Sequence, residues 1–326
     1  MAEFALSLTG LHARNESTIQ ATQDWERGRI DSLTLNAAFH ADCDSLVALQ
    51  KEVGADYISD GQIVNGWQDF LRPLTNGLEN VKKGAMVRWY NTNTFYYTPI
   101  VTGPISSDGN AIASKIERRY AHQGRLRVAV PDPLTFADLA EDHHYGSKEK
   151  LLFAYADVLN DELRKLEKDG VAYVQFSSPA LTARFREKPV SGAQVEALGQ
   201  AIKAATRGVS LRTGFHTIFG DASHYVPDIF DAIPTDDIGF DFTQTDPDSL
   251  SPTKKGIIAG IADARSTYLE GEEELGAMVE QILDATGSKR ITLAPSADLR
   301  FIPRISADEK LRRLGALKLI LGGSGN

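Results

Sequence analysis

The stretch VAYVQFSSPALTARFREKPVSGAQVEALGQAIKAATRGVSLRTGFHTIF, residues 171–219, contains the unit that decides the fold. Its two ends, 171–180 and 209–219, are rich in β-branched and aromatic side chains, a composition that favours strands. Between them, a helical pattern begins at Ser191 and ends at Gly208. A strand, a helix and a second strand predict a parallel pair, because parallel strands need a crossover connection.

The same alternation runs through the whole chain. Strands are predicted at 4–10, 55–63, 126–133, 171–180, 209–219, 236–242, 256–264 and 290–297. Helical patterns cover 147–170, 191–208, 272–287 and 306–321, and Ser306 with Glu309 has capping-box spacing. Eight such units predict an α/β protein, a (β/α)8 TIM barrel formed by residues 1–326 as a single domain. An open doubly wound sheet is the alternative, but no G-x-G-x-x-G loop follows the first strand.

One segment departs from the alternation. Residues 84–105, GAMVRWYNTNTFYYTPIVTGPI, are aromatic, β-prone and polar at once, and they lie between the second and third barrel strands. We interpret them as an aromatic β-hairpin that leaves the barrel after the second strand and lies over one of its ends.

Composition excludes several classes of protein. The chain has 326 residues, a formal charge of −9 and no block of Lys and Arg, so a nucleic-acid surface is not expected. No apolar run approaches the roughly 18 residues of a membrane span, and the N-terminus lacks the basic region of a signal peptide. Cys43 is the single cysteine, which excludes an internal disulfide and thiolate-rich metal sites. We expect a cytoplasmic protein.

The polar residues at the strand ends form the candidate site, because chemistry in such barrels lies at the C-terminal ends of the strands. His216 and Asp241 are the candidate catalytic residues, as a histidine and a carboxylate suit acid–base or metal chemistry. The same ends carry Asp60, Gln62, Asp132, Thr135, Ser177, Ser178, Asp263, Arg265, Ser296 and Asp298. In the alternative interpretation, His216 is a hydrogen-bonded structural residue. Asp241 is then its partner, or is paired with Arg212 or Arg265.

Several segments together resemble the cobalamin-independent methionine synthases, in the order found in that family. They are VRWYNTNTFYYTPIV, the run from DPLTFADL to SSPAL, GFHTIFGDA, IIAGIADARSTYLEG and RITLAPSADLRFIPR. The resemblance covers most of the chain from about residue 45 onward. It implies methionine biosynthesis, in which a methyl group moves from a methyl-tetrahydrofolate to homocysteine. It also implies a double barrel, of which one barrel binds zinc and the N-terminal barrel does not.

The family's zinc ligands are His, Cys, Glu and Cys, and the resemblance places them on His216, Ile218, Asp241 and Ala297. The acidic pair that grips the substrate falls on Ser177 and Ser178. A catalytic zinc normally has three protein ligands, so we predict no metal in this chain and zinc only on a partner barrel. A metal held instead by His144, His224 or Asp221 is an alternative.

The resemblance further implies a methyl-tetrahydrofolate ligand. Trp89 and Tyr96, with the neighbouring Tyr90, Phe95 and Tyr97, either stack on its pterin ring or pack the hairpin against the barrel or a partner chain. Asn91 and Asn93 either bond the ligand or form a turn. Asp132, Ser177, Ser178, Arg184 and Arg265 complete the candidate substrate-binding residues, with Arg184 receiving a carboxylate tail or lying in a solvated loop.

Three functions follow as hypotheses. The first is a zinc-free subunit of a split methionine synthase that works with a separate zinc-bearing barrel. The second is an autonomous enzyme on the same scaffold, either a methyltransferase that holds its metal differently or a metal-free, lyase-like enzyme of the decarboxylase kind. The third is a folate-binding or regulatory barrel without turnover. The partner is either the zinc-bearing barrel or a second copy of this chain.

Overall fold

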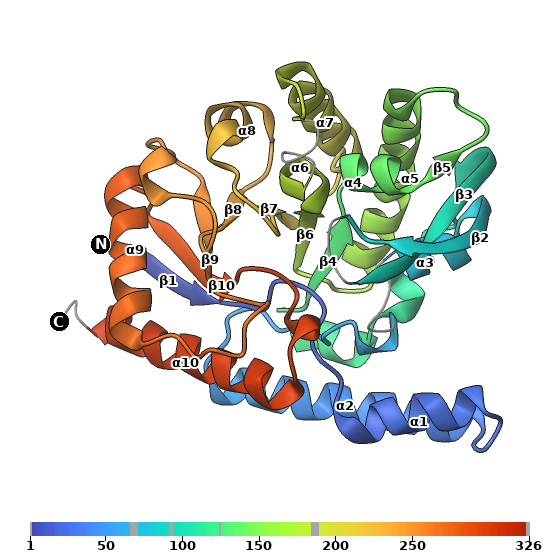
Figure 1. Ribbon diagram of the computed structural model, residues 1–326, viewed down its shortest axis with the longest axis horizontal. Helices are drawn as coiled ribbons and strands as arrows, with labels where there is room; N and C mark the ends of the chain where they lie inside the picture. The colour runs from blue at the N-terminus through green and yellow to red at the C-terminus, as the bar shows by residue number, and fades with distance from the viewer. Residues whose placement is uncertain (1, 66–70, 91–93, 124, 184–188, 324–326) are drawn as a thin grey trace.

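A curled sheet of seven parallel strands forms the centre of the molecule (Figure 1). The computed structural model describes residues 2–65, 71–90, 94–123, 125–183 and 189–323. The sheet has the order β1-β10-β9-β8-β7-β6-β4. Its strands are β1 (Glu3–Leu6), β4 (Arg127–Pro131), β6 (Tyr173–Ser178), β7 (Arg212–Thr217), β8 (Asp237–Asp241), β9 (Gly256–Ala262) and β10 (Arg290–Pro295).

A short extended segment around Ile58 joins the two edges of this sheet. The amide of Asp56 donates to the Leu6 carbonyl at 2.9 Å, on the β1 side. On the β4 side, the Ile58 amide donates to Arg125 at 2.9 Å, and the Arg127 amide donates to the Ile58 carbonyl at 2.8 Å. The predicted barrel is therefore confirmed, with eight parallel segments around one axis.

The second strand is much shorter than the predicted range 55–63. It amounts to a single β-bridge between Ile58 and Leu126. Gly61 and Gln62 follow with positive φ angles of 66° and 45°, which turn the chain away from the barrel wall. Hydrophobic alternation is present in this range, but the left-handed turn ends the strand.

Ten α-helices are described around and beside the barrel. They are α1 (Glu16–Glu26), α2 (Ser32–Glu52), α3 (Arg72–Gly77), α4 (Pro133–Leu139), α5 (Lys148–Lys168), α6 (Pro179–Ala183), α7 (Gly192–Ala205), α8 (Val226–Ala232), α9 (Glu272–Thr286) and α10 (Arg304–Gly323). In Figure 1, α1 and α2 extend along one side of the molecule next to α10. Among the described helices, none is both long and apolar enough to cross a membrane.

The predicted helix starts are right for α5 and α7 and wrong for α10. Ser147 and Ser191 cap α5 and α7 with their hydroxyls, as their positions in the sequence indicate. The predicted start at Ser306 lies two residues inside α10, because the helix already begins at Arg304. The Ala307 amide donates to the Pro303 carbonyl, so the first turn has formed before Ser306 is reached.

The predicted hairpin is confirmed. Strands β2 (Glu79–Arg88) and β3 (Phe95–Ser106) pair antiparallel between the second and third barrel segments. The short strand β5 (Glu141–Asp142) pairs with β3 and makes a second, three-stranded sheet. This small sheet lies beside α3, at the right of the view in Figure 1.

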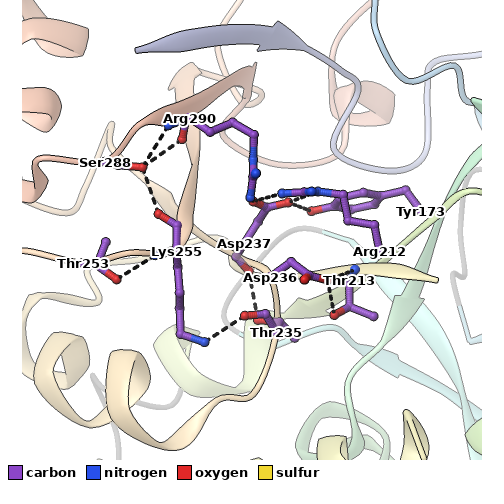
Figure 2. A network of polar contacts seen from close by, with 10 residues as sticks. All are labelled: Tyr173, Arg212, Thr213, Thr235, Asp236, Asp237, Thr253, Lys255, Ser288 and Arg290. Atoms are coloured by element: carbon purple, nitrogen blue, oxygen red, sulfur yellow. Dashed lines mark hydrogen bonds and ion pairs between the residues drawn. The ribbon is translucent and has the colours of Figure 1, made fainter. Parts of the chain in front are cut away.

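The N-terminal end of the barrel is closed by an ion-pair network around Asp237 (Figure 2). This carboxylate is 1% exposed and accepts hydrogen bonds from Arg212 at 2.9 Å, Arg290 at 2.7 Å and the Tyr173 hydroxyl at 3.1 Å. Burial raises the pKa of Asp237, and the Arg212 guanidinium opposes that effect. Arg212 therefore pairs with Asp237, and the alternative that it pairs with Asp241 is wrong.

We expect the substitution Asp237→Asn to destabilise the fold by about 3–5 kcal/mol, because it breaks a buried ion pair while two guanidinium groups remain. Urea unfolding at neutral pH measures this difference. Asp161→Asn, on the exposed face of α5, removes the same charge and should change stability by less than about 0.5 kcal/mol. Equal stability of the two variants would contradict a closing role for Asp237.

Candidate functional site at the C-terminal end of the barrel

His216 lies inside the barrel on β7 with no exposed surface. Its ring fits against two glycines of neighbouring strands. A Cβ atom on Gly239 would lie 2.7 Å from its Cδ2 atom, and one on Gly260 would lie 3.0 Å from Nε2. Within the part of the chain that the structure describes, neither ring nitrogen has a hydrogen-bond partner. The interpretation of His216 as a hydrogen-bonded structural residue stays a prediction, because the Phe240 backbone lies near enough to act on its pKa.

Burial, with a smaller effect of the Arg127 charge, lowers the pKa of His216 to about 3. A weak hydrogen bond with the Phe240 backbone, too poor in geometry to count among the hydrogen bonds above, opposes this shift. The imidazole is neutral at physiological pH and keeps the ability to donate from one nitrogen and accept at the other. A buried nitrogen without a hydrogen-bond partner lowers the stability of the fold, so its presence indicates an atom that a ligand could bond.

Asp241, at the end of β8, is also fully buried. Its Oδ1 atom accepts from the Thr243 amide at 3.1 Å and from the Thr243 hydroxyl at 2.5 Å. Its Oδ2 atom lies 4.0 Å from Nη2 of Arg265 and has no hydrogen-bond partner among the described residues. Of the alternatives, the pairing with Arg265 is observed and a hydrogen bond to His216 is not. Burial raises the pKa of Asp241 to about 6, against the effects of Thr243 and Arg265.

Asp132, Ser177 and Ser178 are buried, and each has a hydrogen-bond partner within the protein. Asp132 caps α4 by accepting from the Thr135 amide at 2.8 Å, and it accepts from the Ser178 hydroxyl at 2.9 Å. Burial raises the pKa of Asp132 to about 6. The Ser177 hydroxyl accepts from the Gln175 amide nitrogen at 2.9 Å. A substrate role for these three residues stays a prediction, since their polar groups already have partners.

The donor set that the resemblance implies does not fit a zinc ion. Ile218 and Ala297 stand at the two thiolate positions, and both are buried hydrocarbon side chains. Among the described residues, no group of three His, Cys, Asp or Glu side chains could hold a metal, which covers His144, His224 and Asp221 as well. His216 and Asp241 alone give two donors, fewer than a catalytic zinc normally has.

Three aromatic side chains close the barrel mouth. Trp89, at the end of β2, lies 4.9 Å from Phe219 and 6.0 Å from Phe301, measured between ring centroids. Phe219 and Phe301 are 5.1 Å apart in an edge-to-face arrangement. We call these three residues the aromatic cap. Trp89 is 3% exposed, so it packs the hairpin against the barrel and has little free ring surface for a pterin.

A cavity of about 1120 Å³ opens beside the cap. It lies between the loop after β1, helices α1 and α3, the hairpin and the start of α10. Its charged lining residues are the cations Arg14, Arg72, Lys83, Arg300 and Arg304 and the carboxylates Glu16, Glu26 and Asp308, with Asn15, Thr75, Asn76 and Tyr97 among the uncharged ones. We call it the basic cavity, because its lining has five cationic side chains against three carboxylates.

Within the part of the chain that the structure describes, three of the cations in the basic cavity have no carboxylate partner. Arg304 is paired with Asp42 and Asp308, and Arg300 lies 3.5 Å from Asp298. No described carboxylate lies within 4 Å of the cationic nitrogens of the other three, which are Arg14, Arg72 and Lys83.

Arg14 bonds the Ile63 carbonyl, and Lys83 lies 3.5 Å from the Tyr97 ring centroid. Burial, together with the nearby Arg72 charge, lowers the pKa of Arg14 to about 10. A depressed pKa next to a like charge indicates a place where an anion would be stabilised.

The structure therefore divides the predicted residues into two places. His216 and Asp241 are buried on the neighbouring strands β7 and β8, and Arg265 lies 4.0 Å from Asp241, whereas Trp89 belongs to the aromatic cap. Tyr96 is buried, with its hydroxyl donating to the Leu139 carbonyl at 2.9 Å, and it does not line the basic cavity. The predicted positions Asn91, Asn93 and Arg184 lie outside the described residues.

Sequence reasoning missed Arg14 and Lys83. Arg14 follows the first strand, and applying the strand-end rule to that strand as well would have found it. Lys83 stands in a strand whose partner was recognised only by its aromatic residues, so no local signal marked it.

Comparisons with known proteins give a consistent family. The model of the cobalamin-independent synthase N-terminal domain matches residues 64–287, more than two thirds of the chain. The chain is 22% identical over 289 residues to a methionine synthase from Sulfolobus acidocaldarius, which covers 87% of this chain and 82% of that protein. It is 23% identical over 310 residues to a methionine synthase from Sulfurisphaera tokodaii, with 94% and 88% covered.

A solved structure has the same fold. The B12-independent methionine synthase from Shewanella sp. W3-18-1, in complex with selenomethionine, superposes with a TM-score of 0.75 at 18% identity. The superposition covers 98% of each chain.

We expect Asp241→Asn to change the pH dependence of stability. The pKa of Asp241 is about 6 in the folded chain and 3.8 in the unfolded one, so the protonated carboxyl stabilises the fold fully below about pH 4. That contribution is lost as the pH rises through 6 and amounts to about 3 kcal/mol. Asn does not titrate, so the variant should gain about that much relative to the wild type between pH 4 and pH 8.

Urea unfolding at pH 4, 6 and 8 measures this gain. Asp284→Asn, at an exposed position of α9, serves as the matched control and should differ from the wild type by a constant amount. A stability difference for Asp241→Asn that does not vary with pH would show that the carboxyl is already charged in the folded protein at pH 4.

Proposed function

Because the chain belongs to the family of cobalamin-independent methionine synthases, we propose that it takes part in methionine biosynthesis by methyl transfer. In this proposal, the methyl group moves from a methyl-tetrahydrofolate to homocysteine. The chain supplies a zinc-free barrel, and a separate zinc-bearing barrel activates the homocysteine thiol.

The observation that carries the proposal is the donor set at the barrel mouth. A thiol has a pKa near 8.5 and is mostly protonated at neutral pH, so methyl transfer to sulfur needs a group that forms the thiolate. A metal is the usual means, but Ile218 and Ala297 stand where the thiolate ligands would be. The neutral His216 and the single carboxylate of Asp241 are a weak substitute.

The basic cavity supports the folate part of the proposal. Its volume suits a ligand of that size. Arg14, Arg72 and Lys83 would hold the carboxylates of a glutamate tail through charge-assisted hydrogen bonds. Tyr97 offers an aromatic surface beside them. The chain would thus bind and orient the methyl donor at the edge of the barrel mouth.

Purified chain, with and without a zinc-bearing methionine synthase barrel from the same organism, tests the assignment. Methionine formation from methyl-tetrahydrofolate and homocysteine should require both proteins. Formation by this chain alone, with stoichiometric zinc, would overturn the zinc-free role and favour an autonomous enzyme. Ligand binding without any methionine in either mixture would favour a regulatory barrel. A homodimer as the working state would appear as a stable dimer that does not bind the second barrel.

We expect Arg72→Gln to weaken the binding of a triglutamylated methyl-tetrahydrofolate about tenfold, because a charge-assisted hydrogen bond is worth roughly 1.5–3 kcal/mol. Arg72 is exposed and makes no described ion pair, so folding should be unaffected. Calorimetric titration measures the affinity. Arg207→Gln, an exposed site near the N-terminal end of β7, is the matched control and should bind like the wild type. Equal affinities of the two variants would show that the basic cavity is not the folate site.

A further inference from the structure

The aromatic cap is assembled from three separate sectors of the barrel. Phe219 follows β7 and Phe301 follows β10, and two other strands, β8 and β9, separate these in the sheet. Trp89 comes from the hairpin, which is inserted between the second segment and β4. Side chains that start from such distant points of the rim and touch one another must meet over the barrel axis. The cap therefore lies across the mouth.

The residues below the cap are sealed from solvent. His216 lies three residues before Phe219, and Asp241 ends the intervening strand β8; both have no exposed surface. His216 has two ring nitrogens and Asp241 one oxygen without described partners. The ring nitrogens of His216 can meet a ligand only if the side chains around them move, because His216 has no exposed surface.

The backbone of the cap is strained in its closed position. Phe219 has a φ angle of +69°, in the left-handed region that side-chain-bearing residues rarely adopt. Tyr90, next to Trp89 and 5.5 Å from its ring, has a φ angle of +49°. Such conformations persist only where the surrounding packing holds them, and they are common at switch regions. Loss of the ring contacts would therefore let these segments relax.

Arg300 connects the cap to the basic cavity. Its guanidinium lies 4.7 Å from the Phe301 ring centroid and 5.9 Å from that of Trp89. Its Nε atom is 3.5 Å from the buried carboxylate of Asp298. The same side chain lines the basic cavity. A carboxylate in the cavity would compete with Asp298 and the rings for this one cation.

We propose that the aromatic cap is a gate over His216 and Asp241, and that Arg300 couples its opening to a carboxylate-bearing ligand in the basic cavity. The ligand that fills the cavity would bind first, draw Arg300 toward it and loosen the cap. A second small molecule would then reach His216. The inference rests on the proposed function only in taking the basic cavity as the site of a carboxylate-bearing ligand, and its test needs no turnover.

Reaction of histidines with diethyl pyrocarbonate, followed by mass spectrometry of peptides, reports opening in the full chain. The reagent attacks the neutral imidazole, and the low pKa of His216 keeps it neutral throughout. The exposed His143 calibrates the reagent, and the buried His12, bonded to Asp308, reports general unfolding. In the wild type, His216 should react at least a hundredfold more slowly than His143.

Trp89→Ala should raise the reaction rate of His216 at least tenfold and leave that of His12 unchanged. Trp25→Ala, at a Trp that is 43% exposed on α1, is the matched control and should leave His216 protected. Phe301→Leu, a milder change in the same cap, should give an intermediate rate. Equal protection of His216 in the Trp89 and Trp25 variants would overturn the gate. Parallel increases at His12 and His216 would show general loosening and would also overturn it.

A separate measurement tests the coupling between the basic cavity and the cap through Arg300. Glutarate, a simple dicarboxylate, should raise the His216 rate of the wild type severalfold at an ionic strength matched with sodium chloride. Arg300→Met keeps the apolar stem of the side chain and should abolish this response. A glutarate response that survives in the variant, or is absent in the wild type, would overturn the role of Arg300. This experiment contains no folate or homocysteine. A negative result would therefore overturn the coupling without deciding the proposed function, which the methionine-formation assay tests.

Discussion

The space around the barrel axis is the constraint on which the structure depends. Eight parallel segments point side chains into one narrow cylinder, so a large inward side chain needs a missing one beside it. Glycine provides the gap each time. A Cβ on Gly214 would overlap the Tyr173 hydroxyl, and a Cβ on Gly256 would overlap the Asp237 carboxylate. His216 uses two such gaps on β8 and β9.

The polar groups buried at the two ends of the barrel differ in how well they are paired. At the N-terminal end, Asp237 has three hydrogen-bond donors and its charge is balanced by arginines. At the C-terminal end, His216 and Asp241 are buried with some of their polar atoms unpaired. Burial lowers the pKa of His216 and raises that of Asp241, so it favours the neutral form of each. A stable barrel could satisfy both ends equally. Leaving one end unsatisfied is typical of a site that a ligand completes.

Local sequence patterns were sufficient for most of the architecture, and long-range contacts decided the rest. Strand composition and helix caps indicate the barrel because they depend on neighbours in the chain. The shortened second strand depends on the left-handed turn at Gly61, and the pairing of Arg212 with Asp237 depends on sheet register. The position of Trp89 in the cap required knowledge of the ends of two distant strands, which no local pattern contains.

The hairpin gives a physical link between the two candidate binding places. Trp89, at its tip, belongs to the cap over the axis, whereas Lys83 and Tyr97, on its strands, line the basic cavity. Trp89 and the pair Lys83 and Tyr97 are carried by the same two strands, which are hydrogen-bonded to each other along their length. Any displacement of the hairpin therefore changes the aromatic cap and the basic cavity together, so one element can both line the ligand cavity and cover the barrel mouth.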